Sequence, residues 1–156
     1  MRKAFAVLTL LLIPFAAWGW SGKVVGVSDG DTITVLNENT KTTTRIRVYG
    51  IDCPESGQPF GRKAKEFTSK MVFGKVVEIH PVEEDRYGRL VAHVYIGGVS
   101  LAEELVRAGL AWVYTRYCKS VVTCNRLHQL QQEARDEKKG LWSDKNPQPP
   151  WKHRRR

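Results

Sequence analysis

The stretch "VSDGDTITV", residues 27–35, places an Asp-Gly pair between two runs of apolar and β-branched residues. Such runs are typical of strands, and an Asp-Gly pair between them is a strong signal for a β-hairpin. Taken alone, the stretch therefore predicts a hairpin turn. Asp31 nevertheless stands at the start of the second run, where acidic residues are depleted. Half of a metal site is the alternative interpretation.

The sequence around this hairpin predicts five short strands, at residues 23–27, 32–36, 42–51, 75–85 and 89–98. Apolar residues at helical spacing predict one helix between residues 60 and 74, after the third strand. Two more helices are predicted after the fifth strand, at 100–108 and 125–139, the first opened by a Ser-x-x-Glu capping box. This order favours an α+β domain on a five-stranded Greek-key barrel of the oligonucleotide-binding type (OB-fold) with three helices.

The N-terminus has the pattern of an export signal. Arg2 and Lys3 precede an apolar run over residues 4–17, and Ala17 and Gly19 are small residues at the positions a signal peptidase reads. The run is shorter than the roughly 20 residues that a membrane span needs. We therefore expect residues 1–19 to be removed, giving an exported protein, periplasmic or secreted, with no membrane span. A retained signal anchor is the alternative.

The chain is basic, with a formal net charge of +9, and cleavage would remove only the charges of Arg2 and Lys3. A positive balance favours polyanions such as nucleic acid, anionic glycans or a cell surface, without choosing among them. Part of the charge lies in residues 144–156, a Pro-rich segment ending in "WKHRRR". Its composition predicts a disordered tail. The folded domain is therefore expected over residues 20–143.

The three cysteines are Cys53, Cys118 and Cys124. Export to an oxidising compartment favours a disulfide between Cys118 and Cys124, and two free thiols would require a reducing compartment. Cys53 has no neighbouring His and no helix N-terminus to lower its pKa. We therefore predict that it is a buried, inert thiol.

Two further segments carry charged residues at predicted strand ends. "RVYGIDCPE", residues 47–55, ends a strand with Asp52 and Glu55, and "EEDRYGRL", residues 83–90, opens another with Arg89. Each segment alone is more commonly structural, as a Pro-terminated strand or a charged turn. Their combination with Asp31 suggests a single site.

The residue types in that set suit phosphodiester chemistry. Asp31 and Asp52 can offer hard oxygen ligands to Ca²⁺, together with the backbone carbonyl of Cys53 and water. A carboxylate such as Glu55 can orient or deprotonate an attacking water. Forked guanidinium donors, here Arg47 and Arg89, are suited to the charge that grows on phosphoryl oxygens.

The segments "DGDT", "RIRVYGIDCPE" and "DRYGR" resemble, in the same order, the three signature segments of the staphylococcal nuclease (thermonuclease) family. The similarity continues through "LAEELVRAGLAWVY" and "EKKGLWS" and covers roughly residues 23–143. The resemblance implies an OB-fold barrel with three helices. It also implies that the protein is a monomer. The implied activity is Ca²⁺-dependent hydrolysis of DNA and RNA with little sequence preference, leaving 3′-phosphate ends.

The resemblance also implies roles for individual residues. The calcium ligands would be Asp31, Asp52 and the Cys53 carbonyl, with Asp29 nearby. Glu55 would act on the attacking water and Arg47 and Arg89 on the transition state, whereas a neighbouring phosphate would be held by Arg86, Tyr87 and Tyr114. Cys53 stands where well-known members have Thr, and the loop after Glu55 is shorter, which bears on substrate preference and rate more than on reaction type.

Two other classes of function compete with a nuclease. A barrel of this kind could bind single-stranded nucleic acid through basic and aromatic side chains without cleaving it. An exported basic protein could also adhere to anionic glycans. Only the nuclease explains the combined presence of Asp31, Arg47, Asp52, Glu55 and Arg89.

Overall fold

The computed structural model describes residues 19–154. The predicted export signal lies in residues 1–19 and so falls, except for Gly19, outside this range. Among the described residues, no helix has the length and apolar character needed to cross a membrane. The elements are β1 (Trp20–Asp29), β2 (Thr32–Asn37), β3 (Thr42–Val48), β4 (Ile51–Asp52), α1 (Gly61–Val72), β5 (Val76–Glu84), β6 (Leu90–Ile96), β7 (Val99–Ser100), α2 (Leu101–Arg107), β8 (Trp112–Val113), α3 (Val121–Asp136), η1 (Gly140–Ser143) and α4 (Pro150–His153).

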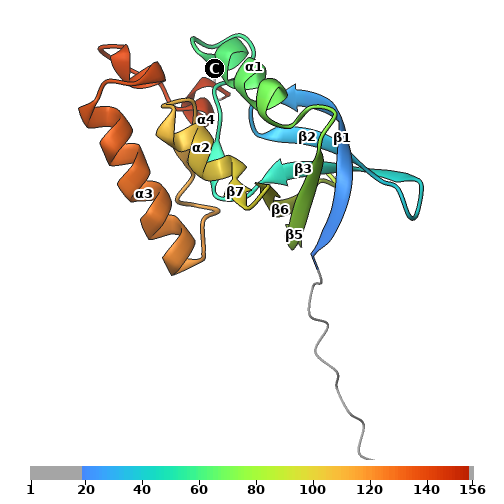
Figure 1. The fold of residues 1–156 in the computed structure, drawn as a ribbon. Helices are drawn as coiled ribbons and strands as arrows, with labels where there is room; N and C mark the ends of the chain where they lie inside the picture. Colours follow the sequence, from blue (N-terminus) through green and yellow to red (C-terminus); the bar gives the residue numbers. More distant parts are fainter. Residues whose placement is uncertain (1–18, 155–156) are drawn as a thin grey trace, which may run out of the picture.

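Five long strands form the predicted barrel (Figure 1). They pair in the order β3-β2-β1-β5-β6, and a parallel pairing between β3 and β6 closes the sheet on itself. Alternate side chains of each strand point inward, and the buried interior includes Ile33, Ile46, Ile79 and Val94. The α+β class and the OB-type barrel predicted from the sequence are confirmed.

The third strand ends earlier than predicted. The sequence predicts one strand over residues 42–51, whereas β3 stops at Val48 and β4 is a separate two-residue strand paired with β8. Gly50 separates them with φ = 79°, a conformation that glycine adopts without steric cost. The backbone amide of Tyr114 donates to the Gly50 carbonyl over 2.9 Å. This turn directs Asp52 toward the barrel end that carries the β1–β2 turn.

Residues 19–154 include four α-helices, one more than the sequence predicts, because the C-terminal segment adds the short α4. α1 packs on β1, and α2 lies between the barrel and α3 (Figure 1). Ser100 caps α2 as predicted, accepting a hydrogen bond from the Glu103 amide. α3 begins at Val121 rather than at the predicted Asn125, because Ser120 caps it and accepts from the Thr123 amide.

The predicted disulfide between Cys118 and Cys124 is present and ties the first turn of α3 to the preceding loop. Cys53 is the buried free thiol that the sequence predicts. Burial raises its pKa well above the usual thiol range, so the thiol stays protonated and unreactive at neutral pH.

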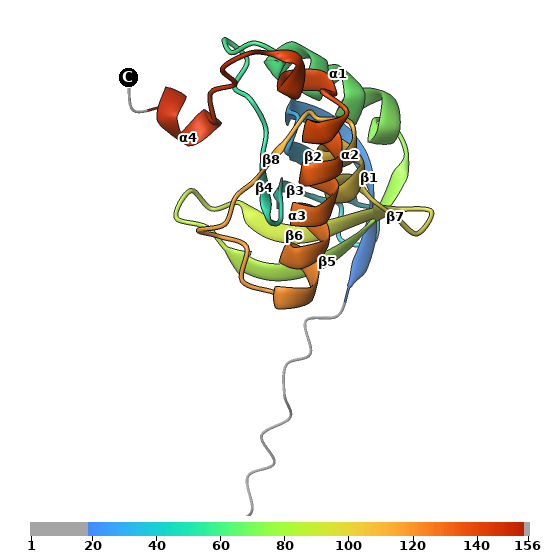
Figure 2. The same cartoon turned by 90° about the vertical axis from the view of Figure 1, so that its left-hand side faces the viewer.

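Residues 144–154 differ from the predicted disordered tail. They fold back over the domain and end in α4, on the far side of the barrel from the start of β1 (Figure 2). The Gln58 side-chain amide donates to the Gln148 carbonyl over 3.0 Å, and the Trp151 ring stacks on Tyr114. Composition alone predicts disorder because it does not register these specific tertiary contacts.

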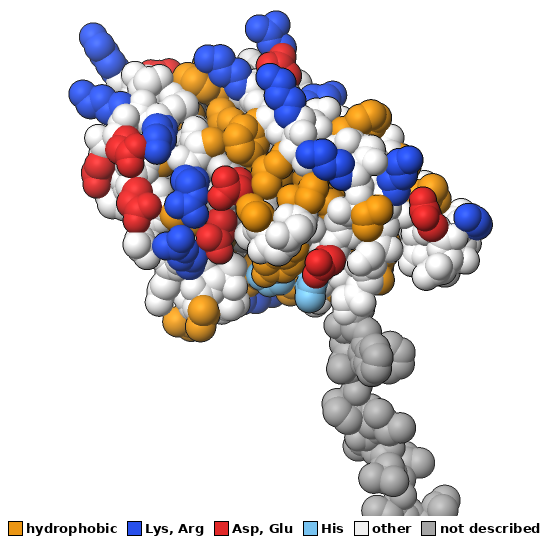
Figure 3. All heavy atoms as spheres, in the orientation of Figure 1, with side chains coloured by type: hydrophobic (Ala, Val, Ile, Leu, Met, Phe, Trp, Pro, Cys, Tyr) orange, Lys and Arg blue, Asp and Glu red, His pale blue; other side chains and the backbone are white. Residues whose placement is uncertain are grey.

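On the face seen in Figure 3, side chains of both charges intermix over α3, and apolar side chains gather nearer the middle of the face. The positive charge of the chain is therefore not gathered into one patch on this face. The predicted site residues lie in a separate cleft.

Candidate active site

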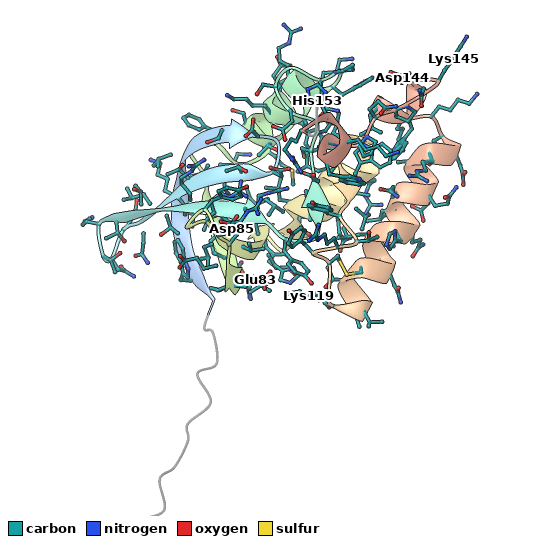
Figure 4. The ribbon with its side chains drawn as sticks, turned by 180° about the vertical axis from the view of Figure 1, so that it is seen from behind. Glu83, Asp85, Lys119, Asp144, Lys145 and His153 are labelled. Carbon is teal, nitrogen blue, oxygen red and sulfur yellow. A yellow bond between two sulfur atoms is a disulfide. The ribbon has the colours of Figure 1, made fainter. Side chains whose placement is uncertain are left out.

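One cleft of about 830 Å³ contains every predicted site residue. It lies at the end of the barrel where the β1–β2 turn, the end of β3, the loop after β4 and the β5–β6 turn meet. Figure 4, seen from behind, shows Glu83 and Lys119 close together in the wall of this cleft, with Lys119 Nζ 3.1 Å from Glu83 Oε2. The predicted residues in its wall are Asp29, Asp31, Arg47, Asp52, Cys53, Glu55, Arg86, Tyr87, Arg89 and Tyr114.

The opening stretch of sequence forms both a hairpin turn and part of this cleft. Asp31 occupies the turn between β1 and β2 and is only 5% exposed. Its Oδ2 accepts a hydrogen bond from the Cys53 amide over 2.6 Å, and its Oδ1 accepts from the Thr32 hydroxyl over 3.1 Å. The Asp31 carbonyl accepts from the Val48 amide. These bonds fix the carboxylate relative to β3 and the segment after β4.

Arg47 lies between two buried carboxylates. Its Nη1 is 2.8 Å from Asp31 Oδ2, and its Nη2 donates to Asp52 Oδ1 over 2.8 Å. Nη1 has no well-directed hydrogen bond, so charge attraction accounts for its contact with Asp31. Burial alone would lower the pKa of Arg47, but Asp31 and Asp52 outweigh it and raise that pKa. The guanidinium is therefore always charged.

The acidic segment after β4 has two different carboxylates. Asp52 is 1% exposed, and burial raises its pKa although Arg154 and Arg47 oppose the rise. Glu55 has a side chain that is 36% exposed and sits in a loop closed by Gln58, whose amide donates to the Glu55 carbonyl and whose side chain accepts from the Glu55 amide. Asp52 is thus a fixed, enclosed group, whereas Glu55 faces the solvent of the cleft.

Arg89 is oriented by Asp85, a residue that the sequence analysis did not select. Arg89 Nε donates to Asp85 Oδ2 over 2.7 Å, and Arg89 Nη2 lies 2.7 Å from the same oxygen. Asp85 Oδ1 accepts from the backbone amides of Tyr87 and Arg89. Partial burial would raise the pKa of Asp85, but these bonds lower it. An Asp that opens a Gly-containing turn is the sequence signal that could have identified it.

The predicted phosphate-binding residues lie farther out. Arg86 and Tyr87 are exposed, with Arg86 Nη2 donating to the Tyr87 hydroxyl over 2.6 Å. Tyr114 lines the cleft, but its ring is stacked parallel to Trp151, with centroids 5.0 Å apart. Arg86 and Tyr87 are accessible to a polyanion, while one face of Tyr114 is covered.

The structure adds cationic residues that the sequence analysis missed. Arg45, Arg116 and Lys119 line the cleft. Arg154 Nη2 lies 2.7 Å from Asp52 Oδ2, and its Nη1 pairs with Glu55 Oε1. About a hundred residues separate Arg154 from these partners, so local sequence patterns hold no signal for the contact.

The carboxylates fit a hard divalent cation. Asp31 and Asp52 present buried oxygens on either side of Arg47, and the guanidinium of Arg154 already sits as a positive group between Asp52 and Glu55. Carboxylate and carbonyl oxygens are the ligands that Ca²⁺ prefers. Within residues 19–154 no group of three or more His, Cys, Asp or Glu side chains is arranged to hold a metal ion.

Gly61 supports the loop that carries Glu55. A Cβ at this position would overlap the Glu55 carbonyl oxygen. We predict that Gly61→Ala shifts the loop and lowers the rate of any reaction that uses Glu55 about tenfold, since small displacements of a reacting group are costly. Gly57→Ala is the matched control, because a Cβ there meets nothing within 4 Å. Steady-state rates at saturating substrate would test this; equal rates for the two variants would contradict it.

Comparisons with known proteins place the chain in a family. The family described as "Staphylococcal nuclease homologue" matches residues 45–144. An "uncharacterized endonuclease" of Escherichia coli O157:H7 is 44% identical over 158 residues, covering 100% of this chain and 99% of that protein. A "micrococcal nuclease" of Shigella flexneri is 39% identical over 163 residues, covering 98% and 91%. The chain therefore belongs to the staphylococcal nuclease family.

Proposed function

We propose that this nuclease is a Ca²⁺-dependent endonuclease that hydrolyses phosphodiester bonds of DNA and RNA with little sequence specificity and leaves 3′-phosphate ends. We further propose that it acts as an exported monomer, in a periplasm or outside the cell. The observation that carries the proposal is the clustering in one cleft of Arg47, held between Asp31 and Asp52, with Glu55 and Arg89.

The side chains divide the work according to their surroundings. Asp31, Asp52 and the Cys53 carbonyl would hold Ca²⁺, which when bound would stabilise negative charge on the phosphate. Glu55 is partly exposed and close enough to solvent in the cleft to orient a water and accept its proton. Residues 47–55 contain two carboxylates, Asp52 and Glu55. Only the Glu55 side chain is exposed enough to reach water, which supports the role of Glu55 as the base.

The two arginines would act on the phosphoryl oxygens. Arg47 and Arg89 are held by Asp31, Asp52 and Asp85 before any substrate arrives. Donors fixed in advance stabilise growing charge without reorganising. Arg86 and Tyr87, on the exposed rim, would hold a neighbouring phosphate of the same strand. Backbone contacts of this kind carry no base preference, which supports low sequence specificity.

The test is cleavage of single-stranded DNA by the purified protein in Ca²⁺ and in chelator, beside Glu55→Ala, which reveals any contaminating nuclease. We expect cleavage by the wild type in Ca²⁺ only, and little by the variant. End analysis of the fragments would establish whether the phosphate remains on the 3′ side.

Salt-sensitive DNA binding without cleavage in either condition would instead support a non-catalytic module for single-stranded nucleic acid. Cleavage that persists in chelator, or that is unchanged in Glu55→Ala, would contradict the assigned metal or base.

A further inference from the structure

The C-terminal segment Pro149–Arg154 lies against the cleft and contacts its reacting groups. Arg154 pairs with both Asp52 and Glu55. Three residues earlier, Trp151 stacks on Tyr114 with an interplanar angle of 1° and also packs edge-on against Trp112 at 5.8 Å. The segment is thus attached at two points, one ionic and one aromatic.

The ionic contact occupies a carboxylate that a bound metal ion would need as a ligand. Arg154 Nη2 is 2.7 Å from Asp52 Oδ2, and the same carboxylate is the proposed calcium ligand. Arg47 already lies against Asp52 Oδ1, so Arg154 occupies the remaining oxygen, Oδ2, that a divalent cation would take. A cation placed on that oxygen beside Arg154 would be strongly repelled by its guanidinium. Since the Arg154 side chain is 43% exposed, water and salt screen the contact, and it can be exchanged for a stronger cation.

The aromatic contact uses a surface that a nucleobase would need. Bases of a bound strand stack on exposed aromatic rings, and Tyr114 lines this cleft together with Tyr87 and Tyr117. In the structure the indole of Trp151 lies parallel to the Tyr114 ring with centroids 5.0 Å apart. A base could stack on this face of Tyr114 only after Trp151 leaves.

We propose that Pro149–Arg154 is an intramolecular strap that competes with the metal ion for Asp52 and Glu55 and with a nucleobase for Tyr114. This inference rests on the proposed function. In the closed state the strap lies on the cleft, and only molecules in which it has left can bind Ca²⁺ at full affinity. The apparent affinity for Ca²⁺ is therefore reduced in proportion to the fraction of molecules in the open state. Binding of Ca²⁺ displaces Arg154 from Asp52 and Glu55, and a base stacked on Tyr114 displaces Trp151.

A strap and a substrate clamp differ in which groups they occupy. A clamp would leave Asp52, Glu55 and Tyr114 free and would turn its own cations toward the substrate. Here Arg154 and Trp151 are directed at those three groups instead. The contacts therefore favour competition over assistance.

Isothermal titration of the metal-free protein with Ca²⁺ alone tests the strap without any turnover. Arg154→Ala is expected to bind Ca²⁺ about tenfold more tightly than the wild type. Lys152→Ala is the matched control: Lys152 is exposed on the same helix and forms no ion pair with any described residue. Lys152→Ala removes the same unit of charge from an exposed position, where one charge has a small effect. The Ca²⁺ affinity of this variant should therefore stay within about twofold of the wild type.

A second readout follows the strap itself. Trypsin should cut the wild-type chain after Arg154 faster in Ca²⁺ than in chelator, as judged by mass spectrometry of the released tail. Equal Ca²⁺ affinity in the wild type and Arg154→Ala, or protection of the tail by Ca²⁺, would overturn the strap and leave the nuclease proposal intact. No Ca²⁺ binding to either protein would overturn the calcium site and the strap together.

Discussion

Arg89→Ala is expected to lower kcat for DNA cleavage about 10²-fold or more, the usual effect of removing one donor that acts in the transition state. The structure gives the physical reason. Asp85 fixes the guanidinium through contacts of 2.7 Å to Nε and Nη2, so the group enters the reaction with its orientation already set. KM should change much less, because a contact made only in the transition state does not contribute to ground-state binding.

Arg86→Ala is the matched control for this prediction. Arg86 lies in the same turn but is exposed, and its partner is the Tyr87 hydroxyl. Its loss should raise KM and reduce the salt slope of DNA binding by about one phosphate contact, with a small effect on kcat. Steady-state kinetics at several salt concentrations would separate the two. Equal losses of affinity with unchanged kcat in both variants would refute the role of Arg89 in the transition state.

Arg47→Ala is expected to destabilise the protein as well as inactivate it. Arg47 is the positive partner shared by Asp31 and Asp52, and the three side chains are between 2% and 11% exposed. Removing one partner from a buried ion pair costs about 3 kcal/mol, because the remaining charges are left uncompensated. In chelator we therefore expect a fall in Tm of roughly 10 °C.

Calcium should largely reverse this loss of stability. A cation bound between Asp31 and Asp52 replaces the missing positive charge, and a ligand stabilises the folded state in proportion to its binding. The rise in Tm on adding Ca²⁺ should thus be larger for Arg47→Ala than for the wild type, without recovery of activity. Arg45→Ala, an arginine two residues away on β3, should show neither effect. A variant as stable as the wild type in chelator would show that the two carboxylates do not need Arg47.

The strands of the barrel were predictable because apolar and polar residues alternate along them with a period of two. This pattern can be recognised from neighbouring residues alone. In β3 the alternation of Arg45 and Arg47 with Ile46 and Val48 appears in the structure as a cleft-facing and a buried face. Capping of α2 by Ser100 was predicted for the same reason. Elements whose limits depend on distant contacts were less well predicted, as with the break at Gly50 and the start of α3.

The sequence by itself selected the candidate site residues: Asp31, Arg47, Asp52, Glu55 and Arg89 belong to three short motifs whose order and residue types suit phosphodiester chemistry. Only the tertiary structure brought the motifs together, because closure of β3 on β6 places turns from distant parts of the chain at one end of the barrel.

The tertiary structure alone also decided how these groups are paired. The ion pair of Arg154 with Asp52 joins residues separated by 102 positions, and no local pattern encodes it. The amino-acid composition of residues 144–156 predicts a solvated basic tail, because composition gives the number of charges but not the residues that pair with them. The buried carboxylate of Asp52 and the partly exposed carboxylate of Glu55 supply those partners. That attraction, together with the stacking of Trp151 on Tyr114, is why the tail folds back onto the site.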